Sequence, residues 1–207
     1  MLRPYGKHII MKKLLIATNN KGKLKEFQAL LKDLDIELVT PADINLNLEV
    51  EEDGATYAEN ATKKAVAFAQ ASGLVALADD SGLEVDALNG APGLHSARYS
   101  PKPNASDADR RVYMLENLKD KPRPWKAHFH ATIVIATPAQ DIRITEGNCY
   151  GEVIPEERGA NGFGYDPIFL LPDLNKTTAE LSMAEKNRLS HRAQAARNAI
   201  PILKEIL

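Results

Sequence analysis

The sequence predicts an α/β fold with a mixed sheet at its centre, and three features of the chain support that prediction. Apolar strand-like runs alternate with helix-periodic segments through the N-terminal part of the chain. Two alternating segments, 128–137 and 142–150, are then typical of a long hairpin. No repeat, low-complexity tract or linker divides the sequence, so we expect all of these elements in one body.

The first elements expected are a strand, a helix and a second strand. Residues 14–17 form a short apolar run that predicts the first strand, and residues 36–39 are expected to form the second. Between them, apolar residues recur at three- and four-residue spacing, which is the period of a helix with one buried face. The members of that stripe are Leu24, Phe27, Leu31 and Leu34.

An acidic, irregular segment, 41–54, separates these elements from the next helix. Thr56 and Glu59 match a capping box that opens this helix, and Gly73 is placed to end it. The apolar run 74–78 then predicts a buried strand, because it is short and continuous.

The second half of the chain adds a helix, a loop and a short strand besides the hairpin. Residues 105–119 predict the helix, and a Gly-rich loop, 159–166, leads into an apolar strand at 167–171. The apolar face of the helix is expected to consist of Val112, Leu115 and Leu118.

The C-terminal segment predicts one more helix, from about Ser182, where Ser182 and Glu185 fit a capping box. Pro201 is expected to kink or break it. Lys186 and His191 are five positions apart, so on a straight helix they diverge by about 140°. Both can reach one ligand only if the helix breaks near Ser190 or if the ligand spans two lobes.

Composition narrows the classes of protein. The 207 residues carry a formal net charge of −2, so nothing favours a nucleic-acid polymer as partner. Cys149 is the only cysteine, which excludes an intramolecular disulfide and a zinc site of several thiolates, and we interpret it as a half-buried hydrophobe. No apolar run reaches the roughly 18 residues of a membrane span, and no signal peptide is evident, so we expect a cytoplasmic enzyme. Residues 1–10 are expected to be an N-terminal extension, and 11–207 a single domain of two lobes.

Two adjacent carboxylates, Asp79 and Asp80, follow the run 74–78 and precede Ser81. Burying charge without a partner is costly, so the pair at a strand end suggests a bound cation, a shared proton or a polar cleft. Ligand clefts at the carboxyl ends of strands are usual in open α/β sheets. A solvated turn is the alternative.

The segment 18–23, TNNKGK, joins a strand to a helix. A helix N-terminus attracts anions through its unpaired N–H groups and partial positive charge, and Lys21 and Lys23 add charge. It is not a Walker A loop, because that glycine and lysine pattern is absent. An ordinary turn with solvated lysines is the alternative.

Two further segments carry residues suited to ligands. The acidic stretch around Glu51, together with Asp80, offers the oxygen ligands that Mg2+ prefers, although a surface acidic loop is the plainer interpretation. The Gly-rich loop offers Phe163 as a stacking face and Asp166 as a group that orients a polar partner, and a plain Gly-rich turn is the alternative.

Taken together, TNNKGK, ADDSGLEVDALNGAPGLHSARY, GANGFGYDP and ELSMAEKNRLSHR resemble the inosine triphosphate pyrophosphatase family, in its bacterial RdgB/HAM1-like branch. The match runs in order from about Lys12 to the C-terminus. It implies a long mixed sheet with flanking helices, forming two lobes around a nucleotide cleft, and a homodimer. It also implies a Mg2+-dependent enzyme that hydrolyses ITP, dITP and XTP to the monophosphate and pyrophosphate, removing deaminated purines from the nucleotide pool.

The same resemblance implies roles for individual residues. Asp80 is implied as the catalytic residue at the metal and the attacking water. Glu51, or its neighbour Glu52, is implied as the second metal carboxylate. The residues implied at the substrate are Thr18, Asn19, Asn20, Lys21, Gly22, Lys23, Ser81, Phe163, Gly164, Tyr165, Asp166, Lys186, His191 and Arg192.

Two other functions fit parts of the pattern. A Maf-like nucleotide pyrophosphatase differs in substrate profile, since it prefers modified pyrimidines or methylated bases. A nucleotide-binding regulatory protein without turnover is disfavoured by Asp80, Lys23 and the acidic loop, because binding alone needs no metal-activated water.

Overall fold

The computed structural model describes residues 12–207, so the expected extension at 1–10 lies outside the described residues. Its centre is a seven-stranded sheet of order β2-β1-β3-β4-β5-β6-β7. β1 pairs in parallel with β2 and β3, and every later pair is antiparallel, which confirms the mixed α/β sheet. The strands are β1 (Lys12–Ile16), β2 (Ile36–Val39), β3 (Val75–Val85), β4 (Trp125–Ala136), β5 (Ile142–Val153), β6 (Phe169–Leu171) and β7 (Lys176–Thr177).

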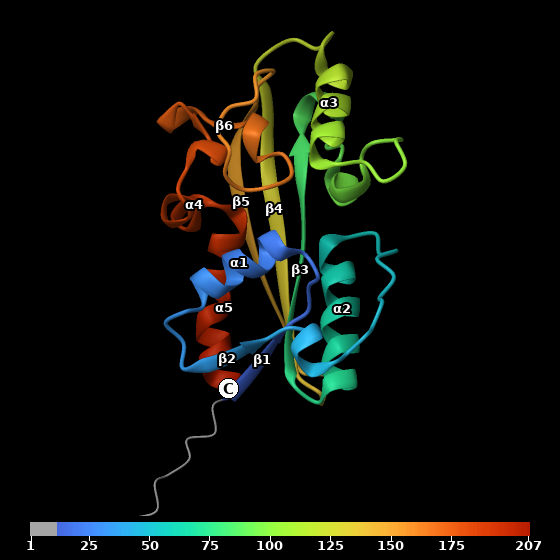
Figure 1. Cartoon of the computed structure of the whole chain (residues 1–207), viewed down its shortest axis with the longest axis vertical. Helices are drawn as coiled ribbons and strands as arrows, with labels where there is room; N and C mark the ends of the chain where they lie inside the picture. Colours follow the sequence, from blue (N-terminus) through green and yellow to red (C-terminus); the bar gives the residue numbers. More distant parts are fainter. Residues whose placement is uncertain (1–11) are drawn as a thin grey trace, which may run out of the picture.

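Helices cover both faces of this sheet, as Figure 1 shows, with α1 and α5 on one face and α2 on the other. Among the 3-10 helices, η3 (Gly93–Arg98) and η4 (Asp166–Ile168) contribute residues to the site. The α-helices are α1 (Lys21–Leu30), α2 (Tyr57–Ser72), α3 (Asp107–Leu118), α4 (Met183–Leu189) and α5 (His191–Ile206).

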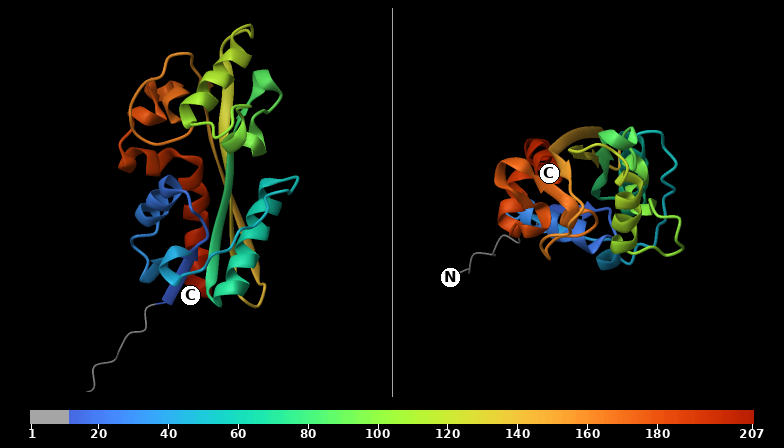
Figure 2. Two further views of the ribbon diagram at one scale, coloured as in Figure 1. Left: turned by 45° about the vertical axis from the view of Figure 1, so that its right-hand side comes forward. Right: turned by 90° about the horizontal axis from the view of Figure 1, so that it is seen from above.

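The molecule has two lobes joined by the long strands β3, β4 and β5, which run through both (Figure 2). One lobe contains β1, β2, α1, α2 and α5, and its core forms two clusters, one on each face of the sheet. The other contains α3, β6 and β7, and has a separate apolar core around Met114 and Phe169. Each lobe is therefore stabilised by its own buried apolar surface, with a polar zone between them.

Strand β3 departs from the sequence expectation. The run 74–78 does not end at the carboxylates: the strand continues through Asp79 and Asp80 to Val85. Almost its whole length pairs with β4, from Ala76 opposite Ala136 to Val85 opposite Ala127. Pairing with β4 supplies backbone hydrogen bonds along this stretch, and charged partners compensate the buried carboxylates. The low strand propensity of aspartate therefore does not end the strand.

The C-terminal helix also differs from the expectation. It breaks at Ser190, whose ψ of 155° is extended, and continues as α5. This break lets Lys186 and His191 face one cavity, which is the first of the two alternatives that the sequence left open. Pro201 does not end α5, which runs on to Ile206.

Helix α3 buries Met114 and Leu118, not Val112, which is 65% exposed. Two positions along a helix turn a side chain by about 200°, so Val112 points away from the buried pair. Among residues 12–207, no helix has both the length and the apolar character needed to cross a bilayer.

Candidate active site

A cleft of about 540 Å³ opens where β1 stops pairing with β3. The last paired residues are Ile16 and Leu77, so the edge of β3 is unpaired by β1 from Asp79 onward. The short segment that follows β1 leads directly to the N-terminus of α1, and this helix end borders the cleft. This is the switch in strand connectivity at which open α/β sheets bind ligands.

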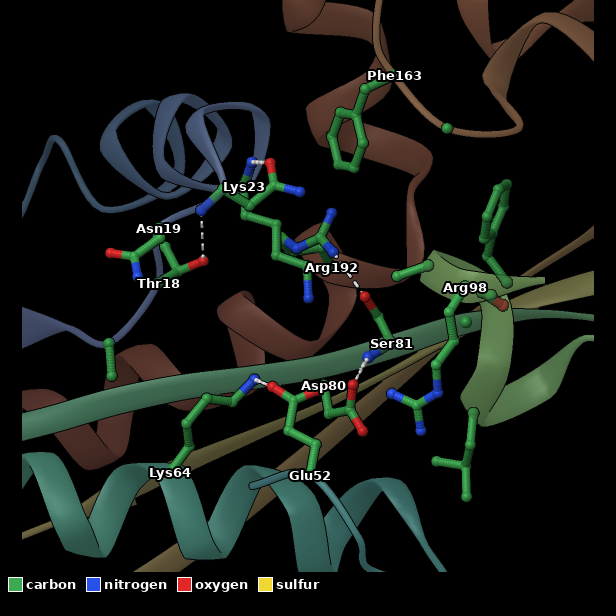
Figure 3. Close-up of a pocket in the computed structure, with 18 of the residues that line it drawn as sticks. Thr18, Asn19, Lys23, Glu52, Lys64, Asp80, Ser81, Arg98, Phe163 and Arg192 are labelled. Atoms are coloured by element: carbon green, nitrogen blue, oxygen red, sulfur yellow. Dashed lines mark hydrogen bonds and ion pairs between the residues drawn. The ribbon is translucent and has the colours of Figure 1, made fainter. Parts of the chain in front are cut away.

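The N-terminus of α1 forms one wall. Asn20 is its N-cap, and the side-chain oxygen accepts from the N–H groups of Gly22 and Lys23 at 2.8 and 3.1 Å. Lys23 points into the cleft (Figure 3), where its Nζ lies 2.5 Å from Asp79 Oδ1. A Cβ on Gly22 would lie 2.5 Å from the ring of Phe163, so only glycine lets this helix meet the Gly-rich loop so closely.

Asp80 lies on the floor of the cleft and is 7% exposed. Its Oδ2 accepts from Asn60 Nδ2 at 3.1 Å, and its Oδ1 accepts from the Ser81 N–H at 3.0 Å. Burial raises the pKa of Asp80 above its usual value, against the opposing effect of Lys23. A carboxylate with a raised pKa next to a cavity is suited to accept a proton at neutral pH.

Two residues beside Asp80 form an ion pair with each other. Glu52 and Lys64 both line the cleft, and Lys64 Nζ lies 2.5 Å from Glu52 Oε1 (Figure 3). Lys64 also donates to the carbonyl of Asp79 at 3.2 Å. Glu51, by contrast, is exposed and is not among the lining residues. The sequence did not decide whether Glu51 or Glu52 is the second metal carboxylate. Of the two, Glu52 is the one that lies beside Asp80.

On the opposite side of β3, buried charges alternate in sign. Arg192, 1% exposed, donates Nε to Asp79 Oδ2 at 3.2 Å and Nη1 to Glu26. Lys186 Nζ lies 2.8 Å from Glu26 and 2.6 Å from Asp166. With Lys23 this makes three cations and three anions, so the set is neutral and each member has an opposite partner. Buried charges persist only with such pairing. We call this set the buried charge cluster: Lys23, Glu26, Asp79, Asp166, Lys186 and Arg192.

The pKa values follow from burial and pairing. Burial alone raises the pKa of Asp79, but Arg192 and Lys23 outweigh it and hold that pKa well below its usual range. The pKa of Glu26 is lowered in the same way, with Arg192 and Lys186 outweighing its burial. Asp79 and Glu26 are therefore suited to stay ionised at neutral pH.

His191 begins α5 and lies in the cleft, where its ring stacks on Phe129 with centroids 4.8 Å apart. Burial, and then the charge of Arg192, lowers the pKa of His191 well below 6.5, so the imidazole is neutral. Helix α5 reaches this position because Gly147 has no side chain: a Cβ there would lie 2.3 Å from the His191 carbonyl.

Phe163 faces the same region from the Gly-rich loop (Figure 3). The ring centroid lies 5.1 Å from Lys186 Nζ and 5.9 Å from the Arg192 guanidinium carbon. Asp166 holds the loop, because it accepts from the Phe163 N–H at 2.8 Å. An aromatic face beside paired cations is suited to a flat polar ring.

The structure brings most of the expected substrate residues together. Lys21, Gly22 and Glu51 are the exceptions among the expected residues, since they do not line the cleft. The expected residues that do line it are Thr18, Asn19, Asn20, Lys23, Asp80, Ser81, Phe163, Gly164, Tyr165, Asp166, Lys186, His191 and Arg192.

Four further residues belong to the site and were not expected from the sequence. Asn60 and Lys64 are four apart on α2 and share a helix face; Asn60 donates to Asp80, and Lys64 donates to Glu52 and to the Asp79 carbonyl. Glu26 is three positions from Lys23 on α1, but its spatial partners come from α4 and α5. Arg98, from η3, also lines the cleft.

Among the residues described, no group of three or more His, Cys, Asp or Glu forms a metal cage. Asp80 and Glu52 are among the carboxylates that line the cleft and could bind a divalent cation. These fit Mg2+, which is often held by one or two carboxylates plus water and substrate phosphates.

The chain is similar to known proteins over nearly its whole length. The family model described as "Ham1 family" matches residues 14–202. A dITP/XTP pyrophosphatase of Desulforamulus reducens is 47% identical over 195 residues, 94% of this chain and 96% of that protein. A dITP/XTP pyrophosphatase of Thermus thermophilus is 45% identical over 93% of this chain and 92% of that protein.

Solved structures of HAM1 proteins are similar to this chain in fold. A HAM1 protein from Coxiella burnetii has a TM-score of 0.85 at 43% identity, covering 94% of this chain and all of that one (100%). The Staphylococcus aureus Ham1 protein has a TM-score of 0.83 at 38% identity, covering 95% of this chain and 100% of that one.

Proposed function

The chain belongs to the Ham1 family, and we propose that it hydrolyses dITP, ITP and XTP to the nucleoside monophosphate and pyrophosphate. The observation that carries the proposal is Asp80, a carboxylate with a raised pKa on the floor of a cleft lined by cations. Removal of deaminated purines from the nucleotide pool is the role this activity serves.

The triphosphate is bound by the lobe that contains α1 and α2. The N-terminus of α1 offers N–H groups and a partial positive charge, and Lys23 and Lys64 supply full charges from the two sides of Asp79. Thr18 and Asn19 line the same wall and add polar contacts. Arg98 extends the positive lining from the other lobe.

Hydrolysis at the α-phosphorus requires a positioned water and neutralisation of the leaving pyrophosphate. Asp80 accepts the proton of that water, and Asn60 and the Ser81 N–H hold the carboxylate in place. Lys23 and Lys64 stabilise the charge that accumulates on the phosphates. Asp80 and Glu52 would hold Mg2+, which would supply further charge neutralisation when bound.

The base is bound at the other end of the cleft. Phe163 offers a stacking face, and His191 and Arg192 offer donors to the 6-oxo group of hypoxanthine or xanthine. Four of the five N–H groups of Arg192 are used by Asp79, Glu26 and Ser81, which leaves one for a ligand. Adenine has an amino donor at that position and would leave this buried N–H unpaired, a strong basis for rejection.

Replacing Asp80 with Asn tests the catalytic assignment. Loss of general base catalysis typically costs about 10²- to 10⁴-fold, so we expect ITP turnover to fall by at least 100-fold while ITP binding persists. Unchanged turnover would remove Asp80 from the reaction. Loss of binding together with turnover would point instead to a disrupted fold.

The metal assignment has a matched control in two neighbouring glutamates. Glu52→Gln removes a lining carboxylate beside Asp80, and Glu51→Gln removes an exposed one. We expect Glu52→Gln to raise the Mg2+ concentration needed for half-maximal activity and to weaken Mg2+ binding by calorimetry. Glu51→Gln should change neither, and the reverse order would assign the metal to Glu51.

Three finer features complete the proposal. We expect a homodimer, which the exposed apolar side chains of Ile144 and Tyr150 on β5 support as a surface for a second copy. We also expect a cytoplasmic location, and one domain over 11–207. Light scattering of wild type and Tyr150→Lys tests the dimer, because an equal mass near 22.7 kDa for both would contradict it.

A further inference from the structure

Two side chains of α3 hold the peptide groups of Gly164 from both sides. Asp107 Oδ2 accepts from the Gly164 N–H at 2.7 Å, and Arg111 Nη1 donates to the Gly164 carbonyl at 2.8 Å. Neither residue belongs to the loop. Asp107 also lines the cleft, whereas Arg111 does not. The first turns of α3 therefore determine the backbone position of Gly164.

Both side chains that bind Gly164 are held in place by ion pairs of their own. Arg111 is oriented by Glu157, with Nε and Nη2 at 2.8 and 2.9 Å from the two carboxylate oxygens. Its side chain is 11% exposed. Asp107 is in turn held by Arg110. Bidentate Arg–carboxylate pairs fix geometry as well as adding energy, so the guanidinium that meets Gly164 has a defined position.

Gly164 directly follows Phe163, the aromatic face of the base end of the cleft. Its φ is +62°, which glycine adopts without strain, so the loop can turn sharply at this point. On its other side, Phe163 is anchored by its N–H bond to Asp166. The ring therefore lies between two fixed points, one of which is supplied by α3.

We infer that Asp107 and Arg111 are positioning residues for base recognition: they fix Gly164, and through it the ring of Phe163 on which the purine stacks. This rests on the proposed function. The proposed phosphate ligands Lys23 and Lys64 lie on α1 and α2, whereas this contact lies between α3 and the Gly-rich loop, so its loss weakens substrate binding and leaves the chemical step intact. Interactions of this kind change KM with little effect on kcat.

A double-mutant cycle tests the inference. Arg111→Met keeps the aliphatic stem and removes the hydrogen bonds, and we expect KM for ITP to rise about tenfold, the scale of one charge-assisted bond. The kcat should stay within about twofold. In a Phe163→Ala background, Arg111→Met should raise KM no further, because the ring that it positions is gone. Glu116→Gln, an exposed change on the same helix, is the control and should leave KM unchanged.

Additive effects in the two backgrounds would overturn the inference, as would a fall in kcat without a change in KM. A second readout does not depend on activity. Asp107→Ala should speed hydrogen exchange at the Gly164 amide relative to Glu116→Gln, and equal exchange in both would also overturn it. If the wild-type protein did not hydrolyse ITP, the proposed function would be contradicted. Fast exchange of the Gly164 amide in Asp107→Ala would still support the role of Asp107 in fixing Gly164.

Discussion

Replacing Glu26 with Gln removes one charge from the centre of the buried charge cluster. Glu26 is 2% exposed, and its two oxygens bind different cations, Lys186 at 2.8 Å and Arg192. After the change, Lys186 retains Asp166 and Arg192 retains Asp79. The cluster then has three cations and two anions in a region where water cannot compensate the excess.

Breaking a buried ion pair costs about 3–5 kcal/mol when one charge is left unpaired. Each cation here keeps one acid, and the Gln amide oxygen still accepts one hydrogen bond. We therefore expect a loss near the lower end, about 3 kcal/mol in the free energy of unfolding. That is a large share of the roughly 5–15 kcal/mol that holds a domain of this kind folded.

The assay is urea unfolding at pH 7, with Glu37→Gln as the matched control. Glu37 also binds a lysine, Lys13, at 3.4 Å, but both side chains are 46% exposed. Exposed pairs contribute about 0–1 kcal/mol, so this variant should be near wild type. Equal losses in the two variants, with unchanged m-values, would refute the view that Glu26 is coupled to the cluster.

Three other predictions concern Arg192, Asp79 and Cys149. Arg192→Lys keeps the charge but loses the planar fork, so KM for ITP should rise by about 10- to 100-fold, and an unchanged KM would remove Arg192 from the site. The lowered pKa of Asp79 means that its stabilisation is complete above its unfolded pKa of about 3.9 and is lost as pH falls through the folded value. Acid titrations of stability should therefore be steeper for wild type than for Asp79→Asn, and parallel curves would contradict this. Burial raises the pKa of Cys149 to about 11, so a thiol reagent at pH 8 should label only unfolded protein, and rapid labelling of native protein would contradict the assigned burial.

Much of the site was predictable because its chemistry lies in contiguous motifs. The turn that caps α1 with Asn20, the Asp80 carboxylate and the loop with Phe163 are each short in sequence. The spacing of Lys186 and His191 left two alternatives, a break near Ser190 or a ligand that spans two lobes, and the structure has the break.

The remainder depends on contacts between distant segments. Glu26 lies on a helix whose periodicity indicates only an apolar stripe, and its partners are separated from it by as many as 166 positions. The extension of β3 through Asp79 and Asp80 follows from pairing with β4 and from the charges of Lys23 and Arg192. The local sequence pattern predicts neither the ion pairs of Glu26 nor the length of β3, because both depend on residues that are distant in the sequence.

The most direct test is to measure monophosphate, pyrophosphate and orthophosphate from ITP, XTP, GTP and ATP, with and without Mg2+. The proposed function predicts pyrophosphate and monophosphate from ITP and XTP only, and only with Mg2+. Orthophosphate as the product, or no turnover of any of the four, would contradict it and favour the Maf-like or the non-catalytic alternative.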